Sequence, residues 1–223
     1  MEIYPRLITT TPFENGKIIS YGLIVYALNT GNCIIVQRKH SIEFLLLMTG
    51  NYRPSLIPLL LPNMTTEEQE IIQSIRKPDD FDTIFHSIGF EENLDYARLR
   101  FFEAKLPIIS QSQPLKWTWP KGRLNIDENG LVCAKREFEE EVEMVLPEAI
   151  YISPNYFTEV LHTLTCKVIE TRCWFYVIPE ELPLPPLNNH KEVNDRQWVP
   201  LQEALIKVNQ PDLMPDLQQC LND

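Results

Sequence analysis

The sequence predicts an α/β or α+β sandwich, in which helices cover a β-sheet, with a helical insertion in the first half of the chain. Segments rich in β-branched and aromatic residues alternate with segments of helical spacing. A strongly periodic helix directly follows a glycine-containing loop at 120–129. Helical spacing also fills roughly 70 residues before that loop, and this stretch is too long for a plain loop inside a compact domain.

The first predicted strands form a β-hairpin. Residues 18–28 (IISYGLIVYAL) and 33–37 (CIIVQ) have the composition that is typical of strands. The residues between them, NTGN, favour a turn. We therefore expect two neighbouring antiparallel strands near the start of the chain.

Residues 41–114 are predicted to form the insertion. The run TTEE at 65–68 is typical of a capped helix start, and Pro78 is typical of a helix end. Segments with helical spacing lie at 69–75, 80–88 and 92–104. We expect one domain built from residues 1–40 and 115–223, with residues 41–114 as an inserted subdomain.

The second half of the chain carries the remaining elements. Strands are predicted at 116–119, 158–168, 171–178 and 196–199, and helices at about 130–146 and 201–208. The proline-rich run at 179–190 is predicted to be a surface loop. Strands interrupted by helices in this order favour a sandwich.

Composition and charge limit the function classes. The chain has 223 residues, with 20 Lys and Arg against 31 Asp and Glu, which gives a net charge of −11. This acidity argues against binding of nucleic acid by bulk positive charge, and it is compatible with carboxylates that hold metal ions. No apolar stretch reaches the roughly 20 residues of a membrane-spanning helix. The five cysteines form no C-x-x-C pair, so we expect no structural zinc site and a reduced, cytoplasmic protein.

The segment from Pro120 to Met144 carries the candidate chemistry. A predicted apolar stripe of its helix contains Leu131, Ala134, Phe138, Val142 and Val145. Glu137, Glu140 and Glu141 stand at i, i+3 and i+4, so their carboxylates crowd one flank. Mg2+ or Mn2+ would relieve the repulsion, because these cations prefer oxygen ligands. The alternative is a solvated acidic face, but Arg136 beside Glu137 and the adjoining glycine loop favour a metal site.

The same segment resembles the motif of the Nudix hydrolases, G-x5-E-x7-R-E-U-x-E-E-x-G-U, in which U is a bulky apolar residue. The matching residues are Gly122, Glu128, Arg136, Glu137, Phe138, Glu140, Glu141 and Met144. Glu143 stands where the family has glycine, the residue that usually allows a left-handed turn at the helix end. We therefore expect the helix to continue to about Leu146, where Pro147 stops it.

The resemblance implies a Nudix α/β/α sandwich that hydrolyses a nucleoside diphosphate linked to another moiety, with Mg2+ or Mn2+ as cofactor. It implies that Glu140 and Glu141 are metal ligands and that Glu137 is a ligand or the base that activates water. The carbonyl of Gly122 is a further implied ligand.

Other implied roles are less direct. Arg136 and Glu128 would brace the loop and the helix of the catalytic site. Glu192 precedes Trp198 in a stretch similar to decapping Nudix enzymes, so it is either an additional catalytic carboxylate or an exposed loop residue. Glu159 and Glu170 are weaker candidates.

Three resemblances indicate the substrate. Trp119 and Lys121 belong to a run similar to decapping enzymes and dinucleoside tetraphosphate hydrolases, which makes Lys121 a candidate phosphate contact. Trp119 is a candidate for base stacking, with core packing as the alternative. Residues 131–141 resemble the decapping Nudix proteins of large double-stranded DNA viruses, particularly the asfarvirus type. Those proteins also carry a helical insertion after an early strand. At the corresponding place this chain has Arg38 and Lys39. These two residues are either contacts to RNA or phosphate, or ordinary charges at the end of a strand.

Capped RNA is therefore the first predicted substrate, cleaved to release m7GDP in the cytoplasm of an infected host cell. Dinucleoside polyphosphates and diphosphoinositol polyphosphates are alternatives, and a non-catalytic RNA- or partner-binding module is a third. In the insertion, Arg98, Arg100 and Lys105 lie near aromatic residues and are candidates for a single-stranded RNA track. No membrane partner is expected, and the sequence predicts no oligomeric state.

Overall fold

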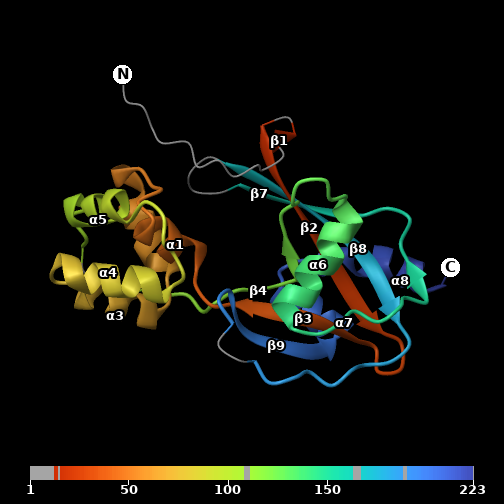
Figure 1. Ribbon diagram of the computed structural model, residues 1–223. Coiled ribbons are helices and arrows are strands. Elements are labelled where there is room, and N and C mark those ends of the chain that lie inside the picture. The colour runs from red at the N-terminus through yellow and green to blue at the C-terminus, as the bar shows by residue number, and fades with distance from the viewer. Residues whose placement is uncertain (1–12, 15, 108–110, 163–166, 188–189, 223) are drawn as a thin grey trace.

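Within the residues that the structure describes, a mixed nine-stranded sheet runs through the sandwich (Figure 1). The computed structural model describes residues 13–14, 16–107, 111–162, 167–187 and 190–222. β2 (Lys17–Ala27) lies at the centre, antiparallel to β3 (Asn32–Arg38) and parallel to β8 (Val168–Ile178). β2 and β3 are the predicted hairpin, and Gly31 in the turn has a positive φ of 73°.

Shorter strands extend the sheet. β9 (Val193–Pro200) pairs with β3, while β6 (Tyr151–Ile152) and β7 (Phe157–His162) pair with β8. The two-residue strands are β1 (Phe13–Glu14), β4 (Trp117–Thr118) and β5 (Lys121–Gly122). The end of the predicted strand 158–168 lies outside the described residues at 163–166. Because β5 pairs with β2, the glycine loop lies beside the central strand.

Helices cover both faces of the sheet, which confirms the predicted sandwich (Figure 1). α6 (Gly130–Val142) packs on one face, where Phe138 lies in a core with Leu23 and Val25 of β2. α7 (Leu201–Lys207) and α8 (Met214–Asn222), joined by a 3-10 turn at Pro211–Leu213, pack on the other face with Ile24. Successive residues of β2 thus serve opposite cores, as the alternation of a strand requires.

The insertion forms a helical body beside the sheet (Figure 1). Its helices are α1 (Ile42–Met48), α2 (Ile57–Leu60), α3 (Thr66–Ser74), α4 (Pro78–Ser87) and α5 (Leu94–Glu103), with 3-10 turns at Pro54–Leu56 and Leu61–Asn63. Phe44, Phe81, Phe85 and Phe101 are buried in a core of its own. Because this core is separate from those of the sandwich, we propose that residues 41–114 are a distinct subdomain. In the described parts of the chain, no helix is long and apolar enough to cross a membrane.

Glu68 joins the start of the insertion to α3. Its carboxylate accepts hydrogen bonds from the N–H and the hydroxyl of Ser41, both at 2.7 Å, and from the N–H of Thr65 at 3.0 Å. The predicted capping box of Thr65 and Glu68 is present. Burial raises the pKa of Glu68, but hydrogen bonds from His40, Ser41 and Thr65 outweigh it and leave the pKa below its ordinary value. The ionised carboxylate therefore fixes how the chain enters the insertion.

Candidate active site

The candidate active site lies along the exposed flank of α6. Asn129 caps the helix by accepting a hydrogen bond from the N–H of Val132 at 3.0 Å. The three predicted carboxylates differ in environment: the side chain of Glu140 is 58% exposed, that of Glu137 is 14% exposed, and Glu141 is buried. They are therefore not equivalent acids on a solvated face.

Arg136 is the centre of an ion-pair network on α6. Its Nε and Nη2 donate to the two carboxylate oxygens of Glu128, at 2.9 and 3.0 Å, as a bidentate pair. Its Nη1 donates to Glu137 and to Glu140, both at 2.8 Å, and its Nη2 also donates to the carbonyl of Arg123 at 2.8 Å. The hydrogen bond from Arg136 lowers the pKa of Glu128. This geometry supports a bracing role for Arg136 and Glu128 between the glycine loop and the helix.

Gly122 lies directly against the carboxylate of Glu137. A Cβ atom at position 122 would stand 2.0 Å from Cδ of Glu137, so any side chain there would displace the carboxylate. The carbonyl oxygen of Gly122 accepts a hydrogen bond from the hydroxyl of Ser20 at 3.0 Å. Glycine is thus required at this position by the close approach of α6 to β5.

Glu141 is the most buried carboxylate of the site. Its Oε2 accepts a hydrogen bond from the N–H of Lys121 at 3.0 Å. Burial raises the pKa of Glu141 to about 8; the charges of Glu137 and Glu192 also raise it, while Lys121 and Arg38 lower it. Burial likewise raises the pKa of Glu137. Acids with raised pKa values that face one another are characteristic of functional sites.

These carboxylates open into a cleft of about 830 Å3 between the sandwich and the insertion. The sandwich contributes the predicted site residues Arg38, Lys121, Gly122, Glu137, Glu140, Glu141 and Glu192. The insertion contributes Leu45, Ile88, Gly89 and Phe90. The structure thus brings together residues that lie more than 150 positions apart in the sequence, and it adds the insertion as the opposite wall.

The donor atoms at this cleft fit a divalent cation in their chemistry. Hard carboxylate and carbonyl oxygens are the ligands that Mg2+ and Mn2+ prefer, and a cation would offset the burial and mutual repulsion that raise the pKa values of Glu137 and Glu141. In the described residues, however, no group of three or more acidic, His or Cys side chains is already arranged to hold a metal ion. The guanidinium of Arg136 bridges Glu137 and Glu140 instead.

His190 is a residue of the site that no sequence motif predicts. Its Nδ1 accepts hydrogen bonds from the N–H groups of Glu192 and Val193, at 3.1 and 2.9 Å. A neutral ring that accepts at Nδ1 carries its proton on Nε2, which lies 3.0 Å from the carbonyl oxygen of Glu140. His190 therefore ties the segment of Glu192 to α6. It stands in a proline-rich loop outside every motif, so the sequence carried no signal for it.

Two predicted substrate lysines have partners within the protein. Lys39 donates from Nζ to the carbonyl of His190 at 3.2 Å, and from its backbone N–H to the carbonyl of Glu192 at 2.7 Å. It holds the segment before β9, so the alternative of a strand-end charge agrees better with the structure. Lys121 lines the cleft, but its Nζ donates to Glu159 at 3.2 Å.

The predicted base-stacking role of Trp119 is wrong, and the alternative of core packing holds. Trp119 is 1% exposed, and its Nε1 donates to the side-chain carbonyl of Gln210 at 2.9 Å. It is buried in the core beneath α7 and α8, on the face of the sheet opposite α6. Trp119 lies in the short gap between β4 and β5, and its side chain enters the core on the side away from the carboxylates.

The structure also corrects the predicted end of the helix. α6 ends at Val142, and Glu143 adopts φ 51° and ψ 38°, the left-handed conformation that favours glycine. The buried guanidinium of Arg196 donates to the carbonyl of Val142 and forms an ion pair with Glu143. Since the turn forms without glycine, Val145 lies beyond the helix, 81% exposed, and is not part of the apolar stripe.

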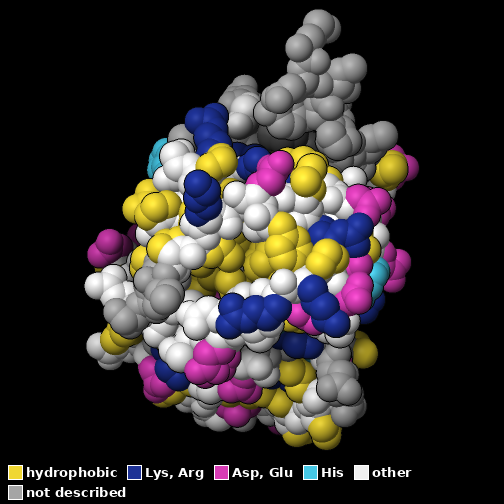
Figure 2. Space-filling view, turned by 90° about the vertical axis from the view of Figure 1, so that its left-hand side faces the viewer, with side chains coloured by type: hydrophobic (Ala, Val, Ile, Leu, Met, Phe, Trp, Pro, Cys, Tyr) yellow, Lys and Arg dark blue, Asp and Glu magenta, His cyan; other side chains and the backbone are white. Residues whose placement is uncertain are grey.

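Two of the three cations of the predicted RNA track have partners within the insertion. Arg98 bonds Asp82 at 2.5 Å and also pairs with Asp95. Arg100 donates to the carbonyl of Tyr52 at 2.7 Å and lies over its ring. Lys105 is exposed. The face of the insertion that points away from the sheet has hydrophobic side chains at its centre, with Lys and Arg side chains around them (Figure 2).

Glu170, a weaker candidate for a catalytic carboxylate, has its partners away from the cleft. Its two oxygens accept hydrogen bonds from Lys17 at 2.7 Å and from Arg172 at 2.9 Å. These bonds lower the pKa of Glu170. The structure therefore separates it from the acids of α6.

The chain is similar to a known protein family and to individual members of it. The family model described as the NUDIX domain matches residues 102–218. The chain is 29% identical over 188 residues to the "mRNA-decapping protein g5R" of African swine fever virus, isolate Warthog/Namibia/Wart80/1980, in a match that covers 68% of this chain and 74% of that protein. The same protein of the Badajoz 1971 Vero-adapted strain is also 29% identical, with 73% of its length covered.

Two of the solved structures that match the chain share little sequence with it. An Ap4A hydrolase of C. elegans is 13% identical with a TM-score of 0.44, covering 92% of this chain and 98% of that one. The E. coli dihydroneopterin triphosphate pyrophosphohydrolase is 12% identical with a TM-score of 0.42, covering 92% and 96%.

Proposed function

The chain belongs to the Nudix family, and we propose that it is a metal-dependent hydrolase that removes the cap of messenger RNA and releases m7GDP. The observation that carries this proposal is the cleft in which the predicted glutamates of the sandwich face the helical insertion. A small nucleotide can bind to the sandwich alone. A capped RNA extends beyond the cleaved bond, so it can also contact the insertion on the other side of the cleft. The similarity to the viral decapping proteins over most of their length supports the same substrate.

Glu137, Glu140 and Glu141, with the carbonyl of Gly122, are the residues that would hold Mg2+ or Mn2+. When bound, such a cation stabilises the negative charge that develops on the phosphoryl oxygens. Arg38 lies in the same cleft and supplies a positive charge for a phosphate. Gly122 keeps space for the Glu137 carboxylate, and Arg136 holds Glu137 and Glu140 in place.

Glu192 is suited to accept a proton from the attacking water. It comes from the segment before β9, which faces α6 across the cleft, and His190 fixes its backbone. To act as a base, Glu192 must be ionised, which places its negative charge close to those of Glu137 and Glu141. A cation held by Glu137 and Glu141 would offset the repulsion between these two acids and Glu192. We therefore assign proton transfer to Glu192 and metal binding to the acids of α6.

The test is a product assay on three substrates: cap-labelled RNA, diadenosine tetraphosphate and a diphosphoinositol phosphate, each with Mg2+ and with Mn2+. Release of m7GDP from capped RNA at the highest kcat/KM supports decapping. Faster hydrolysis of either small substrate would move the function to that substrate. No hydrolysis of any of them, in protein that binds RNA, would indicate a non-catalytic module.

The place of action follows from the substrate. The matching relatives are viral proteins, and capped messenger RNA is translated in the cytoplasm. We accordingly expect the protein to act in the cytoplasm of an infected cell. Fractionation of infected cells checks this expectation, and a nuclear signal would contradict it.

A further inference from the structure

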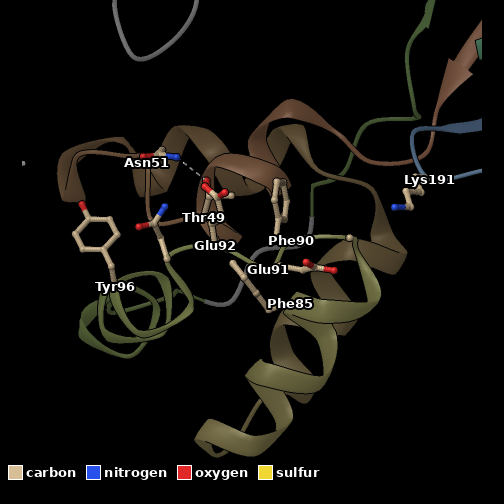
Figure 3. A pocket seen from close by; sticks show the side chains of 10 residues that line it. Thr49, Asn51, Phe85, Phe90, Glu91, Glu92, Tyr96 and Lys191 are labelled. Carbon is tan, nitrogen blue, oxygen red and sulfur yellow. Dashed lines mark hydrogen bonds between the residues drawn. The ribbon is translucent and has the colours of Figure 1, made fainter. Parts of the chain in front are cut away.

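A second cavity of about 550 Å3 lies in the insertion and adjoins the catalytic cleft. Its walls come from the end of α1, the connection between α4 and α5, and the start of α5, while Lys191 lies on a separate segment that precedes β9 (Figure 3). Gly89, Phe90 and Lys191 line both the cavity and the cleft. A ligand whose phosphates lie at the α6 carboxylates can therefore extend into this cavity.

Aromatic side chains form part of the cavity wall. Phe85 and Phe90 lie with their ring centroids 5.6 Å apart at an angle of 39°, and Phe85 is buried in the core of the insertion. Tyr96 lies on α5, on the far side of the cavity from Lys191 (Figure 3). Phe90 and Tyr96 are half-buried and offer flat apolar surface, while Phe85 supports Phe90 from the core. The volume is in the range of ordinary small-ligand pockets.

The charge of the cavity differs from that of the cleft. Glu91 and Glu92 are both exposed and line it, with Lys191 as its one cation among the described lining residues. The cleft has further cations, which are Arg38, Lys121 and Arg123, beside the acids proposed to hold a metal ion. A phosphate is therefore favoured in the metal-loaded cleft and disfavoured in the insertion cavity. A planar group that is positively charged, or that donates hydrogen bonds, suits the cavity best.

We propose that this cavity binds the base of N7-methylguanosine, an inference that rests on the proposed decapping function. Methylation at N7 gives the purine ring a positive charge, which is attracted both to aromatic faces and to carboxylates. The guanine edge also carries the donors N1–H and N2–H2, which a carboxylate such as that of Glu91 or Glu92 can accept. An unmethylated guanine or an adenine lacks the charge and gains less from this wall.

The test compares the binding of m7GDP and GDP to the full chain. The parent protein should bind m7GDP at least about tenfold more tightly than GDP, because only the methylated base has the cationic contact. In the Glu91→Gln, Glu92→Gln double variant this preference should fall to within about twofold, with GDP affinity nearly unchanged. The matched control removes two exposed charges from α3, Glu67→Gln with Glu70→Gln, and should keep the preference.

A second variant, Phe90→Leu, tests the aromatic contact without a change of charge, and circular dichroism checks that each variant is folded. Equal affinity of the parent for m7GDP and GDP overturns the proposal, as does a preference that survives both variants. If the parent nevertheless releases m7GDP from capped RNA, the proposed function stands and only the pocket assignment fails. Preferential m7GDP binding without cleavage of capped RNA would instead support the pocket assignment and contradict the proposed function.

Discussion

The guanidinium of Arg196 lies 3.6 Å from the carboxylate of Glu143, where β9 meets the end of α6. Arg196 is buried and also donates to the carbonyls of Val142 and Pro185. These contacts give the carbonyl at the end of α6 a hydrogen-bond donor, at the place where the family motif normally has glycine. The departure from the motif is therefore accompanied by a compensating residue more than 50 positions away in the sequence.

Replacement of Arg196 by Met is expected to destabilise the protein. The carbonyls of Val142 and Pro185 lose their donor, and at Val142, which is buried, this loss costs about 1–3 kcal/mol in the free energy of unfolding. Urea unfolding measures the change. The control Arg53→Met removes an exposed arginine of the insertion and should change stability by less than about 0.5 kcal/mol. Equal effects of the two substitutions would mean that Arg196 does not cap α6.

Replacement of Glu143 by Gly is expected to be tolerated. Glycine adopts the left-handed conformation of this residue without a Cβ penalty, and this gain offsets the lost ion pair to within about 1 kcal/mol. Glu143→Val should be clearly worse, because β-branched residues disfavour this conformation. Thermal unfolding and the hydrolysis rate are measured together. A Gly variant that keeps its stability but loses activity would give Glu143 a direct role in the reaction.

Gly122→Ala is expected to lower activity with little loss of stability. The new methyl group would meet the carboxylate at the far end of the Glu137 side chain, so this acid is displaced from Arg136 while the backbone stays. A double-mutant cycle with Glu137→Ala separates this effect from a general distortion. In the Glu137→Ala background, Gly122→Ala should cause no further loss of kcat. If Gly122→Ala lowers kcat equally in that background, the substitution acts through the carbonyl of Gly122 and not through Glu137.

Glu141→Gln is expected to lower hydrolysis by orders of magnitude while it stabilises the metal-free protein. The pKa of Glu141 is raised from an ordinary value of 4.5 to about 8 by burial, so the folded state holds its proton more tightly than the unfolded state. The stability of the parent therefore falls as the pH rises from about 4.5 to about 8. Glutamine carries no charge, so the gain in Tm should be larger at pH 8.5 than at pH 5. A parent-like hydrolysis rate would contradict the assignment.

The sandwich and its acidic helix could be predicted because local patterns determine them. The β-branched and aromatic composition of residues 18–28 and the spacing of Phe138 and Val142 reflect burial, and the structure confirms the strand and the helix that they predict. The burial of Glu141 depends on β5, which lies about 20 positions away in the sequence and belongs to a different element. The same is true of Trp119, which is buried beneath α7 and α8 and bonds Gln210, 91 positions away in the sequence. No local pattern reports such contacts between distant segments.

The roles of loop and insertion residues were harder to predict for a related reason. His190 acts through its ring nitrogens on a backbone that only the folded loop brings near, and Arg98 pairs with Asp82 of another helix. Sequence spacing within one helix shows neither contact. A cation near aromatic residues in the sequence therefore suggests a free charge even where the fold supplies a partner.

The last prediction concerns RNA contacts of the insertion through cations that the structure leaves exposed. Arg76, Lys77 and Lys105 are exposed, and Arg76 lies with Phe101 and Phe102 along a groove on the insertion. Cations beside aromatic rings suit a single-stranded RNA, which offers phosphates and bases. Changing all three to Ala should weaken binding of long RNA and reduce the slope of log K against log salt by about 2, since each lost phosphate contact on a single strand removes about 0.7.

The matched control for this surface is Arg98→Ala, which removes a cation that is paired with Asp82. It should lower Tm, because Asp82 loses its partner, and leave the salt slope of RNA binding unchanged. Hydrolysis of a free cap dinucleotide should stay at the parent rate in the triple variant, because none of its three residues lines the catalytic cleft. Unaltered RNA affinity of the triple variant at low salt would show that the insertion contacts RNA elsewhere or not at all. A loss of cap-dinucleotide hydrolysis would instead show that these lysines and arginine support the cleft through the fold of the insertion.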